Sequence, residues 1–200
     1  MKVFFDVKIV GFRKDNTQAV SIALVAEDGE SFYGEIEYPF PVSADDWEKE
    51  NILNHLSKSN EHLKTFADKT VKGKPKDVSN ELNTWLSLKT NCTKDIIKLV
   101  GDACYYDFAF LMDFIVGDAS DIPENISSVY HDINYDMAIY FGISETEALT
   151  KDREEILKEI NKTIAGDKYT AMYDAKRTKE IFEWLIDKVE RSRNNENILR

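Results

Sequence analysis

The first strand-like run of the chain, residues 2–10, restricts the fold more than any other stretch. Successive side chains of a strand point to opposite faces, so one face of this run is entirely apolar. The other face carries Asp6 and Lys8 between two hydrophobic side chains. Such an apolar run is typical of a central, covered strand, where an isolated charge costs on the order of several kcal/mol unless it is paired or has a function. Asp6 and Lys8 therefore require an explanation.

The length and composition predict one domain. The 200 residues, 42% of them hydrophobic, are enough for one well-filled core. We expect this domain to span residues 1–190, followed by a flexible tail over residues 191–200, which has little to bury. Cys92 and Cys104 lack the spacing of a disulfide framework or a zinc site, and the chain has neither a bilayer-length apolar run nor the residue order of a signal peptide. These features predict a cytoplasmic protein with reduced thiols.

The hydrophobic pattern predicts an α/β fold. Strand-like runs on both sides of Asp28-Gly29 indicate a hairpin, so that three antiparallel strands open the chain. A helix is expected over residues 43–56, with Ser43 as its N-cap. A polar stretch at residues 69–77 reads as a loop or as a phosphate-binding segment. A second helix carries Val78, Leu82, Trp85 and Leu86.

The second half of the chain alternates between strands and helices. A buried strand is expected at residues 95–102, followed by an aromatic helix over residues 103–115 and by a weaker strand candidate at residues 127–133. Two helical segments follow, over residues 144–164 and 169–190. The last one has an apolar stripe at three- and four-residue steps, which consists of Ala171, Ala175, Thr178, Phe182, Leu185 and Val189. Together these elements predict a mixed central sheet with helices on both faces.

Three aspartates stand where a packed side chain is expected: Asp6 in the first strand, Asp107 at the start of the aromatic helix, and Asp174 in the last helix. Taken singly, such an acid is more often a helix cap or a paired core residue than a ligand. Acids from distant segments that meet at a sheet can instead bind pairs of Mg²⁺ or Mn²⁺, which stabilise the attacking and leaving oxygens when a phosphodiester is cut.

With these motifs the sequence resembles the DEDD 3′ to 5′ exonucleases of the ribonuclease H-like superfamily, and among them the small bacterial and phage exoribonuclease-like branch. The resemblance covers nearly the whole chain and rests on the pieces VFFDVKIVGF, VSIALVAEDGESFYGEI, WEKENILNHL, CYYDFAFL, YHDI and YTAMYDAKRTKEIFEWL. It implies a ribonuclease H-like fold. It also implies that Asp6, Asp107 and Asp174 match three of the four metal-binding acids.

Two positions depart from the family pattern. Lys8 stands where the family has Glu, and Tyr169 stands where it has the His that acts as general base. An ammonium about 4 Å from a divalent ion repels it by about 8 kcal/mol at an effective dielectric constant of about 20, so Mg²⁺ or Mn²⁺ binding is expected to be weak or absent and Lys8 can replace the ion. A phenol, with a reference pKa of about 10, is a poor base at neutral pH.

Other histidines offer little substitute for the missing base. His131 precedes Asp132 at a strand end, where a structural role is the more common one. His55 and His62 are expected at the surface.

These observations favour an exonuclease-fold protein that is catalytically impaired, a pseudoenzyme, and that binds a single-stranded RNA or DNA 3′ end or a protein partner. The alternatives are an active metal-dependent 3′ to 5′ exonuclease and an acidic interaction or inhibitor protein, for instance one encoded by a phage. The net charge of −11 argues against broad electrostatic binding to nucleic acid or membranes. Local contacts would then fall to candidate phosphate ligands and stacking rings, which are Arg13, Lys14, residues 69–76, Phe12 and Tyr106.

Overall fold

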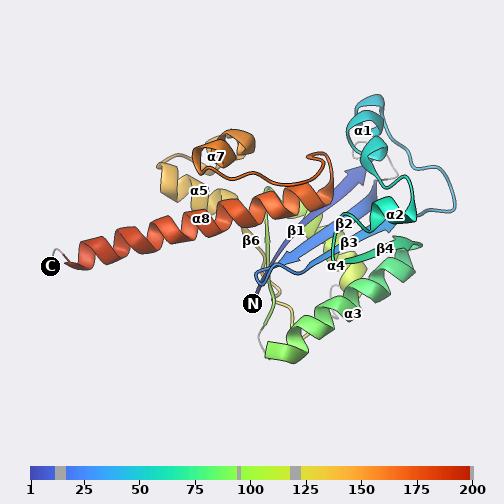
Figure 1. The fold of residues 1–200 in the computed structure, drawn as a ribbon, viewed down its shortest axis with the longest axis horizontal. Helices are drawn as coiled ribbons and strands as arrows, with labels where there is room; N and C mark the ends of the chain where they lie inside the picture. The colour runs from blue at the N-terminus through green and yellow to red at the C-terminus, as the bar shows by residue number, and fades with distance from the viewer. Residues whose placement is uncertain (12–16, 94–95, 118–122, 199–200) are drawn as a thin grey trace.

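The computed structural model describes residues 1–11, 17–93, 96–117 and 123–198, without side-chain detail at residues 91–93 and 189–198. Its centre is a six-stranded sheet with the strand order β4-β3-β2-β1-β5-β6 (Figure 1). The strands are β1 Lys2–Val10, β2 Gln18–Ala26, β3 Ser31–Ile36, β4 Lys69–Gly73, β5 Lys98–Gly101 and β6 His131–Asp132. Strands β1, β2 and β3 pair antiparallel, whereas β4, β5 and β6 join the sheet in parallel pairs. The predicted mixed α/β sheet is confirmed.

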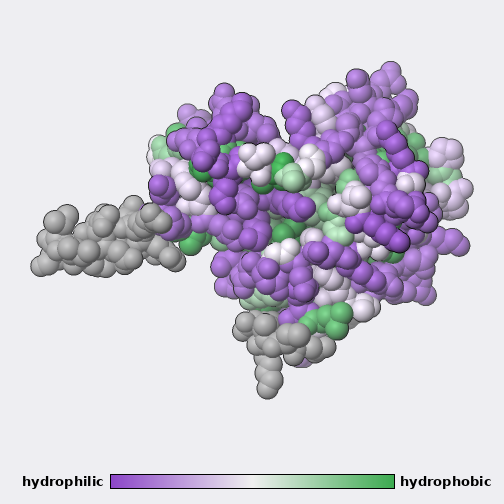
Figure 2. Space-filling model, viewed as in Figure 1, coloured by the Kyte–Doolittle hydropathy of each residue, from purple (hydrophilic) through white to green (hydrophobic). Residues whose placement is uncertain are grey.

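Helices cover both faces of this sheet. They are α1 Asp46–Asn51, the short 3-10 helix η1 Leu53–His55, α2 Asn60–Leu63, α3 Pro75–Thr93, α4 Tyr105–Val116, α5 Ile133–Phe141, α6 Glu145–Thr150, α7 Arg153–Glu159 and α8 Ala171–Ile198. Helices α3 and α4 lie on one face, and α8 crosses the other and extends beyond it (Figure 1). None of the described helices combines the length and the apolar character that a membrane span requires. Hydrophilic residues predominate on the face of the molecule shown in Figure 2.

The alternation of β1 explains how the two layers form. Val3, Phe5 and Val7 are buried in the cluster that contains the core side chains of α3 and α4. On the opposite face, Phe4 packs with the α5 and α8 side chains, its ring centroid 5.5 Å from that of Phe182. Asp6 and Lys8 belong to this second face and therefore point towards α8, as the strand periodicity predicts.

The hairpin prediction is confirmed in detail. Gly29 has a φ of +95°, a left-handed conformation that glycine adopts without a steric cost, and the turn places Ala26 N in hydrogen bond with Glu30 O at 2.9 Å. The helix predicted around Val78 and Trp85 is also confirmed, as α3. The four apolar residues named for it are buried.

Three segments differ from the sequence predictions. Residues 69–73 form strand β4 instead of a loop, because their backbone pairs with β3. The first helix is capped by Asp45 in a capping box with Glu48, not by Ser43. Residues 144–164 form two helices that break where Asp152 caps α7. Helix α8 runs on to Ile198, and the flexible tail over residues 191–200 stays a prediction.

Candidate functional site

Lys8 stands between two carboxylates from opposite ends of the chain. Its Nζ lies 3.1 Å from Asp6 Oδ2 and donates a hydrogen bond to Asp174 Oδ2. Asp174 reaches this point because it lies in the first turn of α8, directly over β1. The three side chains are 16% (Asp6), 17% (Lys8) and 11% (Asp174) exposed, so these charges are largely shielded from water.

Asp107 belongs to the same cluster of charges. It lies in the first turn of α4, where burial, together with the negative charge of Asp6, raises its pKa to about 8 despite the opposing effect of Lys8. Burial likewise raises the pKa of Asp6 to about 6, although Lys8 counteracts it. Burial alone would lower the pKa of Lys8, but Asp6 and Asp174 outweigh it and raise that pKa. The ammonium is therefore a permanent charge at neutral pH.

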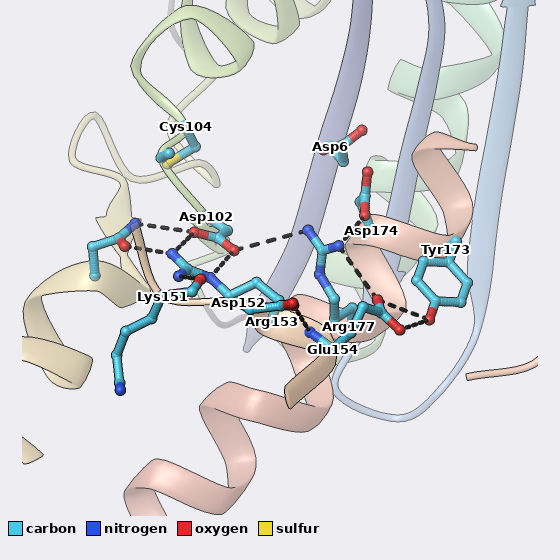
Figure 3. Close-up of polar contacts among 12 residues, drawn as sticks. Asp6, Asp102, Cys104, Lys151, Asp152, Arg153, Glu154, Tyr173, Asp174 and Arg177 are labelled. Atoms are coloured by element: carbon cyan, nitrogen blue, oxygen red, sulfur yellow. Dashed lines mark hydrogen bonds and ion pairs between the residues drawn. The ribbon is translucent and has the colours of Figure 1, made fainter. Parts of the chain in front are cut away.

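Arg177 is a second cation of the cluster. One turn after Asp174, its guanidinium lies 2.8 Å from Asp174 Oδ1, on the carboxylate oxygen that Lys8 does not contact (Figure 3). It also lies 3.8 Å from Glu154 Oε1 and 4.0 Å from Asp102 Oδ2. Its side chain is 20% exposed. Arg177 thus connects α8 to α7 and to the segment after β5.

A further arginine fixes Asp102, which directly follows β5. Arg153 Nε and Nη2 donate to the two oxygens of Asp102, both at 2.7 Å. Arg153 also donates to Asn134 Oδ1 at 2.6 Å and to the carbonyl of Ala148 at 2.8 Å. With its donors distributed in this way, Arg153 is a buried structural residue that orients Asp102 towards Arg177 (Figure 3).

Tyr173 holds the remaining acid of the network. Its hydroxyl donates to Glu154, with oxygen distances of 2.9 and 3.0 Å. Burial and the hydrogen bond to Glu154 raise the pKa of Tyr173 to about 12. Glu154 is therefore fixed on the side that faces Arg177.

Tyr169 lies in the turn that precedes α8 and is 39% exposed. Its ring stacks on the imidazole of His55 with a centroid separation of 4.7 Å. His55 Nδ1 lies 2.5 Å from Asp167 Oδ2. His55 lies at the surface as expected, but its side chain is only 24% exposed because Asp167 and Tyr169 contact it from two sides. His62 is exposed, as expected, and His131 is bonded to Asp136.

A polar row crosses the sheet beside Lys8. Lys8 is paired in register with Ser21, Ser21 with Glu35, and Glu35 with Lys72. Glu35 is 1% exposed and accepts hydrogen bonds from the Ser57 hydroxyl at 2.6 Å and from Lys72 Nζ at 2.9 Å. Because Lys72 is used in this way, and Lys69 pairs with Glu81 at 2.6 Å, two lysines of the predicted phosphate-binding stretch are occupied by acids.

Of the remaining candidate nucleic-acid contacts, only Tyr106 lies within the described residues. Phe12, Arg13 and Lys14 lie outside the described residues. Tyr105 and Tyr106 start α4 immediately before Asp107 and are 67% and 52% exposed, with their rings edge to face at 5.3 Å. Exposed aromatic rings such as these can contact a flat apolar group such as a base.

The arrangement around Lys8 does not fit a divalent metal ion. Asp6 and Asp174 direct oxygens at the same ammonium, and the second oxygen of Asp174 is directed at Arg177. A metal ion at this point would meet two fixed positive charges. Among the described residues, no group of three or more His, Cys, Asp or Glu side chains is arranged to hold a metal ion.

Comparison with solved structures supports the nuclease-like fold. The chain is similar to a 3′-exonuclease from a structure described as 3′-end specific recognition of histone mRNA stem-loop (TM-score 0.64, 12% identity, 93% of this chain and 63% of that one). It is also similar to cell-death related nuclease 4 (TM-score 0.57, 14% identity, 94% of this chain and 64% of that one). Yeast CAF1 co-crystallised with the NOT1 MIF4G domain gives a TM-score of 0.57 at 12% identity, over 94% of this chain and 80% of the matched chain.

These identities show the fold alone, and the chain spans less than two thirds of the length of the first two structures. Neither a family model nor a curated protein sequence matches the chain. What its site does must therefore be argued from its own residues.

Proposed function

We propose that this chain is an exonuclease-fold protein that binds the 3′ end of a single-stranded nucleic acid and does not cut it. The observation that carries the proposal is the Lys8 ammonium between Asp6 and Asp174, at the point where a metal-dependent nuclease needs a divalent cation. The resemblance of its motifs to the small bacterial and phage exoribonuclease-like branch supports, as part of the same proposal, a cytoplasmic protein of that branch.

The loss of cutting follows from two changes that act on the same step. Two-metal hydrolysis requires carboxylates that are free to coordinate, and here they are paired with side-chain cations. It also requires a base for the water, and Tyr169 brings a phenol, which is a poorer general base than an imidazole, to the position where the family has His. Weak or absent binding of Mg²⁺ and Mn²⁺ is part of the same proposal.

Nucleic-acid binding is supported by the exposed aromatic rings that precede Asp107 at the start of α4. Tyr105 and Tyr106 present exposed faces next to Asp107, and stacking of a base on such a ring contributes about 1–3 kcal/mol. Because the net charge is −11, phosphate contacts are a minor contribution, so the affinity should depend only weakly on salt. The histone mRNA stem-loop complex of a similar fold is an instance of 3′-end recognition by a related architecture.

Anisotropy titrations of 5′-labelled single-stranded RNA and DNA test this proposal. We expect equal affinities in Mg²⁺ and in EDTA, weaker binding to a 3′-blocked strand, and full-length oligonucleotide after long incubation. Tyr106→Ala should weaken binding by about 1–3 kcal/mol, whereas Tyr135→Ala, which removes an equally exposed tyrosine from α5, should not. Strand shortening that requires Mg²⁺ would overturn the proposal.

If no oligonucleotide binds, the second form of this function applies, in which the scaffold serves a protein partner. CAF1 with the NOT1 domain is a case of that kind in the same fold. An acidic inhibitor on this scaffold would give the same negative titration. Purification of the tagged protein from its host tests both of these forms against nucleic-acid binding. A stoichiometric protein partner is expected if the scaffold serves a partner or an inhibited target, and not if it binds a nucleic-acid end.

A residual nuclease is the alternative that one observation favours. His55 is oriented by Asp167 and stacks on Tyr169, so an imidazole stands beside the position that lacks the family base. If the protein does shorten RNA, His55→Gln should abolish the reaction while binding stays unchanged. His62→Gln, at an exposed histidine of α2, is the matched control.

A further inference from the structure

The acid cluster contains two side-chain cations, and they approach Asp174 from its two sides. Lys8 from β1 bonds to Oδ2, and Arg177 from α8 lies 2.8 Å from Oδ1. Both oxygens of one carboxylate are thereby directed at basic groups. The sequence motif identifies only Lys8 as a departure, whereas Arg177 lies at an ordinary-looking helix position.

We propose that Arg177 is a second built-in counter-cation of the cluster, so that the acids accept a divalent ion only when both Lys8 and Arg177 are removed. This inference rests on the proposed function, because it explains how the former metal site stays neutralised without metal. Arg177 acts here as a positioning residue for Asp174 and as a barrier to cations.

The surroundings of Arg177 fix it in this role. Beyond Asp174, its guanidinium lies near Glu154 and Asp102. Each of these acids is fixed by another donor, Glu154 by Tyr173 and Asp102 by Arg153. A side chain with three acidic neighbours from three segments has little reason to swing out into solvent.

The chemistry of arginine makes this barrier independent of pH. A guanidinium keeps its charge under all conditions in which proteins are folded. At about 4 Å and an effective dielectric constant of about 20, each unit positive charge repels a divalent ion by about 8 kcal/mol, which offsets the attraction of one carboxylate at the same distance. Removal of Lys8 alone therefore leaves Arg177 to offset the attraction of Asp174 for the ion.

The competing interpretation is that Arg177 makes an ordinary i,i+3 pair with Asp174. Such pairs contribute about 0.2–0.5 kcal/mol on an exposed helix surface and would not influence a metal ion. The side chain of Arg177 is only 20% exposed, and the Asp174 side chain only 11%. The two interpretations differ in the metal affinity of the variants, which is a property that a purely structural pair would not change.

Calorimetric Mn²⁺ titrations of four variants separate them: Lys8→Met, Arg177→Met, the double variant, and Lys162→Met as control. Lys162 also pairs with an acid of α8, Glu180 at 2.6 Å, so its removal changes the net charge equally without touching the cluster. We expect no binding by either single variant or by the control, and one Mn²⁺ in the double variant, at least about a hundredfold tighter than in Lys8→Met. Circular dichroism verifies that each variant is folded. A parallel set with glutamine in place of methionine replaces any methionine variant that does not fold.

Two results would overturn the inference: Lys8→Met that binds Mn²⁺ as tightly as the double variant, or a folded double variant of either set that binds none. Neither result bears on the proposed function, which the oligonucleotide titrations of the wild-type protein decide separately. Conversely, metal-dependent cutting by the wild-type protein would refute the proposed function directly, before any variant is made.

Discussion

Lys8 donates a hydrogen bond to Asp174 across 166 residues of sequence and thereby joins the first strand of the sheet to the last helix. The ammonium also lies 3.1 Å from Asp6, so it shares two carboxylates that would otherwise repel each other. This arrangement links the stability of the fold to the chemistry of the site. A change at Lys8 should therefore be visible in both.

Removal of Lys8 should destabilise the protein strongly. Lys8→Met leaves Asp6 and Asp174 without their shared cation, and breaking a buried ion pair from one side costs about 3–5 kcal/mol. Urea unfolding measures this free energy. Lys49→Met, which breaks the exposed pair with Asp46, should cost less than about 1 kcal/mol, and an equal loss in the two variants would contradict the role of Lys8.

Stability should fall as the pH rises from about 4 to about 8. The pKa of Asp107 is raised to about 8 in the folded protein and that of Asp6 to about 6, so the folded state binds more protons than the unfolded one over this window. Their contribution is complete below the unfolded pKa of about 4 and is lost as the pH passes the folded values.

Asp107→Asn tests this dependence, because a neutral amide removes the proton that the folded state binds. Thermal unfolding of Asp107→Asn should show a flatter pH profile and a higher melting temperature than wild type at pH values above about 8. Asp113→Asn, at an exposed acid of the same helix, is the control and should leave the profile unchanged. An unaltered slope in Asp107→Asn would show that Asp107 ionises normally.

Gly101 should be intolerant of a side chain. A Cβ added at Gly101 would lie 2.4 Å from Cys104 Cβ and 3.1 Å from the Phe5 ring, closer than real contacts allow. We expect Gly101→Ala to cost about 1–3 kcal/mol and to displace the start of α4, which carries Asp107. At Gly73 the nearest atom would lie at an ordinary 3.4 Å, so Gly73→Ala should be nearly neutral. Equal melting temperatures of the two variants would contradict this packing.

Most of the sheet could be predicted because its signals are local. The alternation of residues 2–10 fixes the face of Lys8, and Asp28-Gly29 fixes the hairpin. Strand β4 escaped prediction because Lys69–Gly73 is too polar to indicate a strand, and only its pairing with β3 makes it one. Strand propensity is weak evidence wherever the pairing partner decides.

The site could be predicted only as far as its motifs extend. Asp6, Asp107 and Asp174 were found through the resemblance, and the structure brings Lys8 into contact with two of them. Two signals for the missed residues were present. Asp102 directly follows a buried parallel strand, where functional side chains gather, and Arg177 follows Asp174 at helical i,i+3 spacing.

Glu154 and His55 had no such signal. Glu154 is one of several acids on a short helix, and only tertiary packing brings it to Tyr173 and Arg177. His55 falls within the helix expected over residues 43–56, but only the fold brings it to Asp167 and Tyr169. Contacts between distant segments of this kind depend on the whole structure and not on a local pattern.

The central claim is that the Lys8 ammonium takes the place of a divalent ion. A calorimetric titration of the wild-type protein with Mn²⁺, accompanied by melting curves in Mn²⁺ and in EDTA, tests it most directly, because a ligand that binds the folded state raises the melting temperature by mass action. We predict no binding heat and identical melting temperatures in the two buffers. Stoichiometric Mn²⁺ binding with a clear rise in melting temperature, lost in Asp174→Asn, would contradict the account.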